Sequence, residues 1–413
     1  MAASERAIPE GAIAPSPGLL RVLGPWDGAL ITIGAVVGTG IFLTTSDMAR
    51  ALPHPGLILL VWAVGGLLTL AGALSYAELG ALYPEAGGLY HFLKEAYGPI
   101  WGFLYGWASF LVIMSGGIAA LAVGFGEYLG SFVPFLSTSH VLLSAPIGPW
   151  HWTLNGGQLA GVGAILILTV VNQFGVKEGA WVQNGLTLLK LGGIAVFLIA
   201  GLASVAPSTP SPMMAPLPAH ALGGFGVAMI AALWTYDGWY GLTFSAGEMK
   251  NPARSLPLGI IIGTGAVVVL YVLVNFVYVR TLSIEQLAAN PRVGEAVAFA
   301  LFGPVGARLL SATVLVSAFG CVSGTILYSS RLYQPMAADG IFFRSLALIH
   351  PRYRTPVRSL WAQSGWAMLL TVSGTYDQLF TYVVFAAVLF HAATGAAVIV
   401  LRHTRAEAPR PYR

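Results

Sequence analysis

The stretch Gly34-Ala35-Val36-Val37-Gly38-Thr39-Gly40-Ile41-Phe42 lies in the middle of an apolar run long enough to cross a bilayer. Glycine costs about 1 kcal/mol relative to alanine inside a helix, so the glycines here predict an interrupted helix. Non-helical backbone is tolerated at membrane depth only where it lines a cavity, because lipid cannot satisfy free N–H and C=O groups. The stretch therefore predicts a site inside a membrane protein.

A second apolar run is broken in the same way, at Ala232-Leu233-Trp234-Thr235-Tyr236-Asp237-Gly238-Trp239. An aspartate at mid-membrane costs at least about 2.5 kcal/mol, so this segment is also not an ordinary spanning helix. Two broken helices in corresponding places of two halves are typical of the substrate site of a secondary transporter.

The composition places the chain among polytopic membrane proteins. It is 56% hydrophobic and 9% charged, against about 25% charged residues in soluble domains. We attribute the net charge of +4 to basic cytoplasmic loops and expect no nucleic-acid partner. Cys321 is the single cysteine, so no intrachain disulfide can form, and its apolar surroundings predict a small buried side chain.

Apolar runs long enough to span a bilayer recur ten times. They lie at 28–48, 57–82, 100–132, 158–175, 183–203, 222–245, 258–279, 305–330, 357–373 and 377–401. We therefore predict an all-α integral membrane protein of two five-helix sets. An odd number of crossings per set places the second set upside down relative to the first, as an inverted repeat.

The predicted organisation has five parts. These are a disordered cytoplasmic tail (1–25), the first repeat (26–204), a proline-rich extracellular connector (205–221), the second repeat (222–402) and a cytoplasmic tail (403–413). With both termini inside, fifteen Lys and Arg residues fall in inner segments and four in outer ones. This positive-inside bias predicts a multi-pass protein of the cell (inner) membrane with cytoplasmic termini.

Several motifs resemble a known family. Gly34–Leu43, Ser75–Gly80 and Pro84–Tyr90 are similar to the amino acid–polyamine–organocation (APC) superfamily. Tyr236–Trp239 and Glu248–Pro257 resemble its L-type amino acid transporter (LAT) branch. The resemblance implies the leucine-transporter-like 5+5 inverted repeat with discontinuous helices 1 and 6. It also implies alternating access to a central site and an amino acid as cargo.

The chain departs from that family pattern in three ways. It stops where the family continues into two further crossings, which bears on oligomerisation and folding. Tyr240 stands where the branch commonly has asparagine, so cargo preference can differ. The predicted outer loop 133–157 has no cysteine, so we expect no disulfide-linked accessory subunit and a stand-alone prokaryotic carrier.

The two breaks supply the predicted substrate contacts, which are Val36, Val37, Gly38, Thr39, Gly40, Trp234, Thr235, Tyr236, Asp237, Gly238 and Trp239. Free N–H groups around Gly38, Thr39 and Gly40 would bind a carboxylate. Carbonyls freed in both breaks would accept hydrogen bonds from an ammonium. The alternative for the glycines is close helix packing. Asp237 could instead hold a proton or cap the following half-helix, and the aromatic residues could face lipid.

Lys190 lies deep in the fifth apolar run, where an ammonium must pair inside the protein or lose its proton. The alternative is that it snorkels to an interface. By the resemblance, it would stand in for a sodium ion and bond a carbonyl of the first segment. Glu78 is predicted to form a salt bridge with Lys94 or Arg254, or to relay protons. Ser317 and Ser323 could line the site or bond their own backbone.

We conclude from the sequence that the chain is a sodium-independent transporter of small or neutral amino acids, working by exchange or proton coupling, with no cofactor or metal. The main alternative is an organic amine or polyamine carrier, which would need acidic groups in the pocket. A channel, an intramembrane enzyme and an inactive truncated core are weaker alternatives. An enzyme would need paired catalytic groups, and His391 is a membrane-embedded histidine without an apparent partner.

Overall fold

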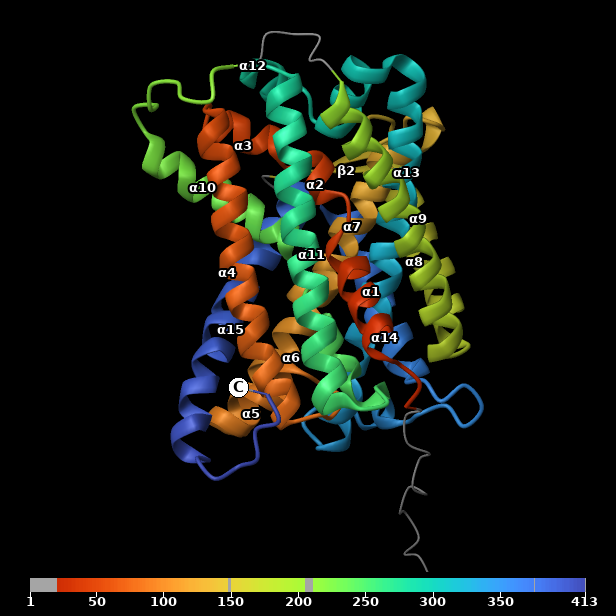
Figure 1. Ribbon diagram of the computed structural model, residues 1–413. Helices are drawn as coiled ribbons and strands as arrows, with labels where there is room; N and C mark the ends of the chain where they lie inside the picture. The colour runs from red at the N-terminus through yellow and green to blue at the C-terminus, as the bar shows by residue number, and fades with distance from the viewer. Residues whose placement is uncertain (1–20, 148–149, 205–210, 375, 413) are drawn as a thin grey trace, which may run out of the picture.

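Long helices run side by side in one bundle, and both ends of the described chain lie at the same end of it (Figure 1). This computed structural model describes residues 21–147, 150–204, 211–374 and 376–412. Most of the predicted N-terminal tail and residues 205–210 of the predicted connector therefore lie outside the described residues.

The elements fall into two groups, before and after the connector. The first group is α1 (Pro25–Val36), α2 (Gly40–Leu43), α3 (Thr45–Ala51), α4 (Pro55–Leu82), α5 (Leu89–Tyr97), α6 (Pro99–Ala108), the π-helical turn η1 (Ser109–Ile113), α7 (Met114–Leu129), the 3₁₀ turn η2 (Pro134–Leu136), β1 (Val141–Ile147), β2 (Trp150–Asn155), α8 (Gly156–Gln173) and α9 (Val176–Ala203). The second is α10 (Ala221–Tyr236), the 3₁₀ helix η3 (Gly241–Glu248), α11 (Pro252–Thr281), α12 (Ile284–Ala289), α13 (Val293–Ala338), the 3₁₀ turn η4 (Arg344–Ala347), α14 (Val357–Ser373) and α15 (Tyr376–Thr404).

Within the described residues, seven helices are long and apolar enough to cross a membrane. The other three predicted crossings are shorter pieces. The first and sixth are interrupted, so that α1 has 12 residues and α10 has 16. Helix α14 has 17 residues. The chain is therefore a multi-pass membrane protein in which two of the predicted crossings are broken.

One small sheet departs from the all-α prediction. Strands β1 and β2 form an antiparallel hairpin in which Leu143 pairs with Leu154 and Ala145 with Trp152. The indole Nε1 of Trp152 donates to the Val372 carbonyl at 2.7 Å, which ties the hairpin to the end of α14. We call the end of the bundle with the hairpin, α3 and α12 the hairpin face, and the end with residues 21–24 and 402–412 the terminal face (Figure 1).

Glu78 pairs with different residues from those predicted. At the terminal end of α4 its carboxylate bonds to Arg402 and lies 3.3 Å from the Arg410 guanidinium. The prediction that Glu78 pairs with Lys94 or Arg254 is wrong. Lys94 Nζ lies 2.5 Å from Asp339 instead, and Arg254 is exposed. Glu78 therefore joins α4 to the end of α15.

Arg331, one of the fifteen basic residues counted in the predicted inner segments, does not lie in a loop. It lies inside α13, 1% exposed, and its Nε donates to the Glu248 carboxylate at 2.8 Å. Glu248 is equally buried, and its backbone oxygen accepts from Val22 N at 2.8 Å. These contacts hold the start of α1, the end of η3 and α13 together near the terminal face.

Lowering the pH is expected to weaken the contact between α5 and the end of α13. Burial opposes ionisation of Asp339, but hydrogen bonds from Lys94 and Tyr90 outweigh it and lower the pKa of this carboxyl. A lowered pKa stabilises the fold above the unfolded-state value, near 3.8, and this contribution is lost as pH falls through the lower folded-state value.

Thermal unfolding of the wild type and Asp339→Asn, measured from pH 7 down to pH 3, tests this expectation. The two midpoints should differ at pH 7 and approach each other as the pH falls below the unfolded-state value, because the wild-type carboxyl is progressively neutralised there. A difference between the two unfolding midpoints that stays constant from pH 7 to pH 3 would contradict the expected role of the Asp339 carboxylate.

Candidate functional site

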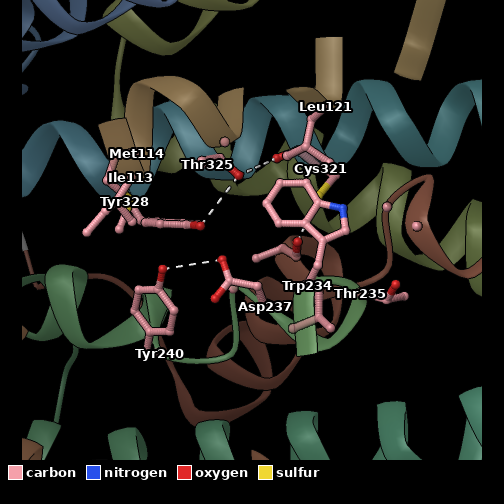
Figure 2. Close-up of a pocket in the computed structure, with 16 residues that line it drawn as sticks. Ile113, Met114, Leu121, Trp234, Thr235, Asp237, Tyr240, Cys321, Thr325 and Tyr328 are labelled. Atoms are coloured by element: carbon pink, nitrogen blue, oxygen red, sulfur yellow. Dashed lines mark hydrogen bonds between the residues drawn. The ribbon is translucent and has the colours of Figure 1, made fainter. Parts of the chain in front are cut away.

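A central cavity lies where the two helix breaks meet, half-way along the bundle. Its walls come from both breaks, from η1 and α7, and from α13 (Figure 2). The lining residues are Ala35, Val36, Gly38, Gly40, Ile113, Met114, Gly117, Leu121, Trp234, Thr235, Asp237, Gly238, Tyr240, Cys321, Thr325 and Tyr328. Seven of the eleven predicted substrate contacts are among them.

The first break is three residues long, because α1 ends at Val36 and α2 begins at Gly40. The second begins at Asp237, directly after α10. Gly238 has φ +101°, which disfavours a side chain, and a Cβ there would lie 3.1 Å from the Ala35 carbonyl oxygen. Glycine at this position lets the backbones of the two breaks approach each other closely.

Lys190 holds the first break. It is fully buried in α9, and its Nζ donates to the carbonyls of Gly34 at 2.8 Å and Val37 at 2.7 Å. Hydrogen bonds from a charged donor are stronger than those between neutral groups. The alternative that Lys190 snorkels to an interface is therefore wrong. Its ammonium donates hydrogen bonds to carbonyls that are freed where α1 ends.

The carbonyls of Val36 and Val37 are not free for a substrate ammonium in this structure, contrary to the prediction. Val37 O accepts from Ser317 Oγ at 2.7 Å as well as from Lys190. Val36 O accepts from Gly38 N at 2.8 Å and from the Tyr271 hydroxyl at 2.9 Å. A carbonyl oxygen has two lone pairs, so both acceptors are already saturated by the protein.

Asp237 faces the cavity and does not cap the next helix, because the residue before η3 is Tyr240. The capping alternative is therefore wrong. Its carboxylate accepts from the Tyr240 hydroxyl at 3.4 Å (Figure 2) and lies 3.7 Å from His391 Nε2. His391 Nδ1 is 2.7 Å from the Tyr76 hydroxyl. The expectation that His391 has no partner was wrong.

The remaining predicted residues surround the cavity without lining it. Thr39 is fully buried, the Tyr236 hydroxyl donates to the Trp62 carbonyl at 3.0 Å, and Trp239 packs on Tyr76 with ring centroids 4.6 Å apart. Ser317 bonds Val37 as described. Ser323 Oγ accepts from Asn172 at 3.3 Å, so it contacts α8 instead of the cavity.

The sequence analysis missed the wall formed by η1 and α7. The π-helical turn Ser109–Ile113 ends at Ile113, and Ile113 and the next residue, Met114, both line the cavity. Such turns often occur at functional sites, but no composition signal marked this one. Cys321 is buried as predicted, and its Sγ also donates to the Ala35 carbonyl at 2.7 Å.

No group of three or more His, Cys, Asp or Glu side chains that could hold a metal ion occurs in the described part of the chain. The polar side-chain groups of the lining residues are hydroxyls, one indole N–H, one thiol and one carboxylate (Figure 2). This set can hydrogen-bond a small polar molecule, and it offers no pairing of a nucleophile with a base.

The comparisons with known proteins find relatives along almost the whole chain. The family description "Amino acid permease" matches residues 23–413. The serine/threonine exchanger SteT of Bacillus subtilis (strain 168) is 31% identical over 405 residues, which cover 96% of this chain and 86% of that protein. The human b(0,+)-type amino acid transporter 1 is 31% identical over 401 residues, covering 96% and 79%.

A third relative, the human large neutral amino acids transporter small subunit 2, is 31% identical over 389 residues, covering 93% of this chain and 70% of that protein. All of these relatives are transporters, and none is an enzyme. The chain is therefore a member of the amino acid permease family of membrane transporters, in the LAT-like branch of the APC superfamily.

Proposed function

We propose that this chain is a sodium-independent exchanger of small neutral amino acids, which works by alternating access to the central cavity. The observation that carries the proposal is the meeting of two broken helices at one cavity, with Lys190 bonded to the first break. The names of the relatives, among them a serine/threonine exchanger, support the same cargo class. The breaks also support the inverted 5+5 repeat as part of this proposal.

The hydrogen bonds that the carbonyls of the first break accept from the protein support sodium independence. Cations such as Na⁺ are bound by oxygen ligands, and carbonyls freed at a helix break are such ligands. Here Gly34 O and Val37 O already receive the Lys190 ammonium, and Val37 O also receives Ser317. A fixed positive charge therefore performs the stabilisation that a bound cation would otherwise supply.

The cavity favours a small neutral substrate. Its volume is about 40 Å³, room for about three water molecules on the same measure, and aromatic rings of Trp234, Tyr240 and Tyr328 border it. Asp237 is the single acidic group in the lining, and no basic side chain is present there. A short side chain fits this space, and we place the α-amino and α-carboxyl groups of the substrate near the two breaks.

We propose further that the terminal face is cytoplasmic in the cell membrane. The positive-inside bias supports this orientation, and it remains when Arg331, which is buried, is left out of the count. We also propose that the protein works without a disulfide-linked subunit, although one relative is named as a small subunit. Cys321 is the sole cysteine of the sequence, and its side chain is only 1% exposed, so it is not accessible for a disulfide with another subunit.

The test is uptake of labelled neutral amino acids into liposomes that contain the purified protein. We expect uptake to require unlabelled amino acid inside and to be unchanged when sodium is replaced by choline. An inward proton gradient distinguishes the alternatives, because uptake that follows the gradient without internal amino acid would establish proton coupling. Empty liposomes give the background.

An organic amine carrier is the competing proposal, because Asp237 lines the cavity and could pair with a cationic cargo. The carboxylate already has Tyr240 as a hydrogen-bond donor and His391 nearby, which favours a positioning role. Uptake of labelled polyamines in the same liposomes, without uptake of any amino acid, would replace the amino acid proposal with this one.

A further inference from the structure

A second cavity lies between the central cavity and the hairpin face. Leu43, Asp47 and Arg50 line it from α2 and α3, and Gly124 and Glu127 line it from α7. Its volume is about 290 Å³, several times that of the central cavity. We call it the outer cavity.

The two cavities are stacked along the same two helices. On α7, Leu121 lines the central cavity, and Gly124 and Glu127, at successive steps of three residues, line the outer one. On α2, Gly40 lines the central cavity and Leu43 the outer one. Three residues of helix rise about 4.5 Å, so the outer cavity begins about one helical turn beyond the central site.

Thr39 and Gly124 contact each other where the two cavities adjoin. Thr39, in the first break, is fully buried, and its Oγ1 has no hydrogen-bond partner among the described residues. A Cβ on Gly124 would lie 2.8 Å from this oxygen, so Thr39 packs directly on the glycine. Thr39, whose neighbours Gly38 and Gly40 line the central cavity, therefore contacts a glycine that lines the outer cavity.

The charges in the outer cavity are only partly balanced. Asp47 and Arg50 form an ion pair within α3, and Arg50 Nη1 also donates to the Ala288 carbonyl at 2.8 Å. The Glu127 carboxylate receives a hydrogen bond from Thr138, but no basic side chain of the described residues forms an ion pair with it. The cavity thus presents the carboxylate of Glu127, without an ion pair among the described residues, in the same space as the Asp47–Arg50 pair.

We propose that the outer cavity is a first binding site for the incoming amino acid, where Glu127 binds its ammonium and Arg50 faces its carboxylate. A molecule with an ammonium and a carboxylate complements both charges, whereas an anion alone would be repelled by Glu127. This inference rests on the proposed function and extends it. Thr39 and Gly124 then form the barrier that the substrate passes to reach the central cavity.

The test compares Glu127→Gln with the wild type in exchange assays from the two sides of the membrane. Uptake by intact cells presents substrate to the hairpin face, and uptake by inside-out vesicles presents it to the terminal face. A hydrogen bond to a charged group contributes enough binding energy that we expect the external half-saturation concentration to rise about fivefold or more. The maximal rate and the half-saturation concentration in inside-out vesicles should change by less than about twofold, because the central site is untouched.

The matched control is Glu295→Gln. Glu295 lies in the same region, but its charge is balanced by Arg292 at 2.9 Å in the same helix, so this variant should leave both half-saturation concentrations unchanged. Thr138→Val is a second variant that keeps the Glu127 charge and removes its hydrogen bond. Thr138→Val should raise the external half-saturation concentration by a smaller factor than Glu127→Gln does. This variant is informative even if Glu127→Gln folds poorly.

The outcomes separate the two proposals. An unchanged external half-saturation concentration in Glu127→Gln, with normal exchange by the wild type, overturns the outer binding site and leaves the proposed function standing. An equal rise on both sides of the membrane also overturns it, because the effect would then belong to the central site. A wild type that exchanges no amino acid overturns the proposed function itself.

Discussion

Lys190→Ala is expected to abolish amino acid exchange. The ammonium donates to Gly34 O and Val37 O at the end of α1. Its removal takes that donor away from both buried carbonyls and leaves Val37 O with Ser317 alone. Hydrogen bonds from charged groups are worth about 1.5–3 kcal/mol each. We therefore expect the exchange rate to fall by about a hundredfold or more, since the loss of both bonds exceeds about 3 kcal/mol.

The measurement is exchange in proteoliposomes with internal amino acid, normalised to the amount of folded protein. Lys250→Ala is the matched control, because Lys250 is exposed at the end of η3 and should keep wild-type rates. Lys190→Met preserves most of the side-chain volume, and it should be as inactive as the alanine variant if the charge is what matters. Full exchange by Lys190→Met would show that packing suffices.

Arg331→Met is expected to destabilise the protein more than any surface substitution. Arg331 and Glu248 are each 1% exposed and joined at 2.8 Å. Removal of one partner of a buried ion pair leaves an uncompensated charge, at a cost of about 3–5 kcal/mol. The double variant Glu248→Leu with Arg331→Met should recover most of that loss, because it leaves no unpaired charge.

Thermal unfolding in detergent measures both variants. Arg358→Met is the control, since Arg358 is exposed near the same face and its loss should shift the unfolding midpoint little. A double variant that is less stable than Arg331→Met would contradict the ion-pair explanation. In that case Glu248 would contribute through other contacts, such as the backbone around Val22.

The features that the sequence predicted correctly depend on local chemistry. The breaks at Gly38 and Asp237 follow from the cost of glycine and of a charge within a membrane helix, and the helices end there. The family resemblance, and not local chemistry, implied that Lys190 bonds a carbonyl of the first segment, and it does. Its role as a sodium substitute stays a prediction until exchange by the variants is measured.

The features that the sequence could not predict depend on distant partners. Whether a freed carbonyl is available is decided by side chains such as Tyr271 and Ser317, which are 235 and 280 residues away from the atoms they bond. Glu78 meets Arg402 across 324 residues. Composition and spacing carry no information about such pairs, because they arise from how whole helices pack.

Helix η3 has a mechanical consequence. It contains eight residues in 3₁₀ conformation, whereas runs longer than about three or four are uncommon. At about 2.0 Å per residue it extends about 16 Å, and the same residues wound as α-helix would extend about 12 Å. Rewinding would shorten it by about 4 Å. The segment between the cavity and the terminal face is thus longer than the same residues would be as α-helix, and a change of its winding would alter the distance between Tyr240, which lines the cavity, and Glu248.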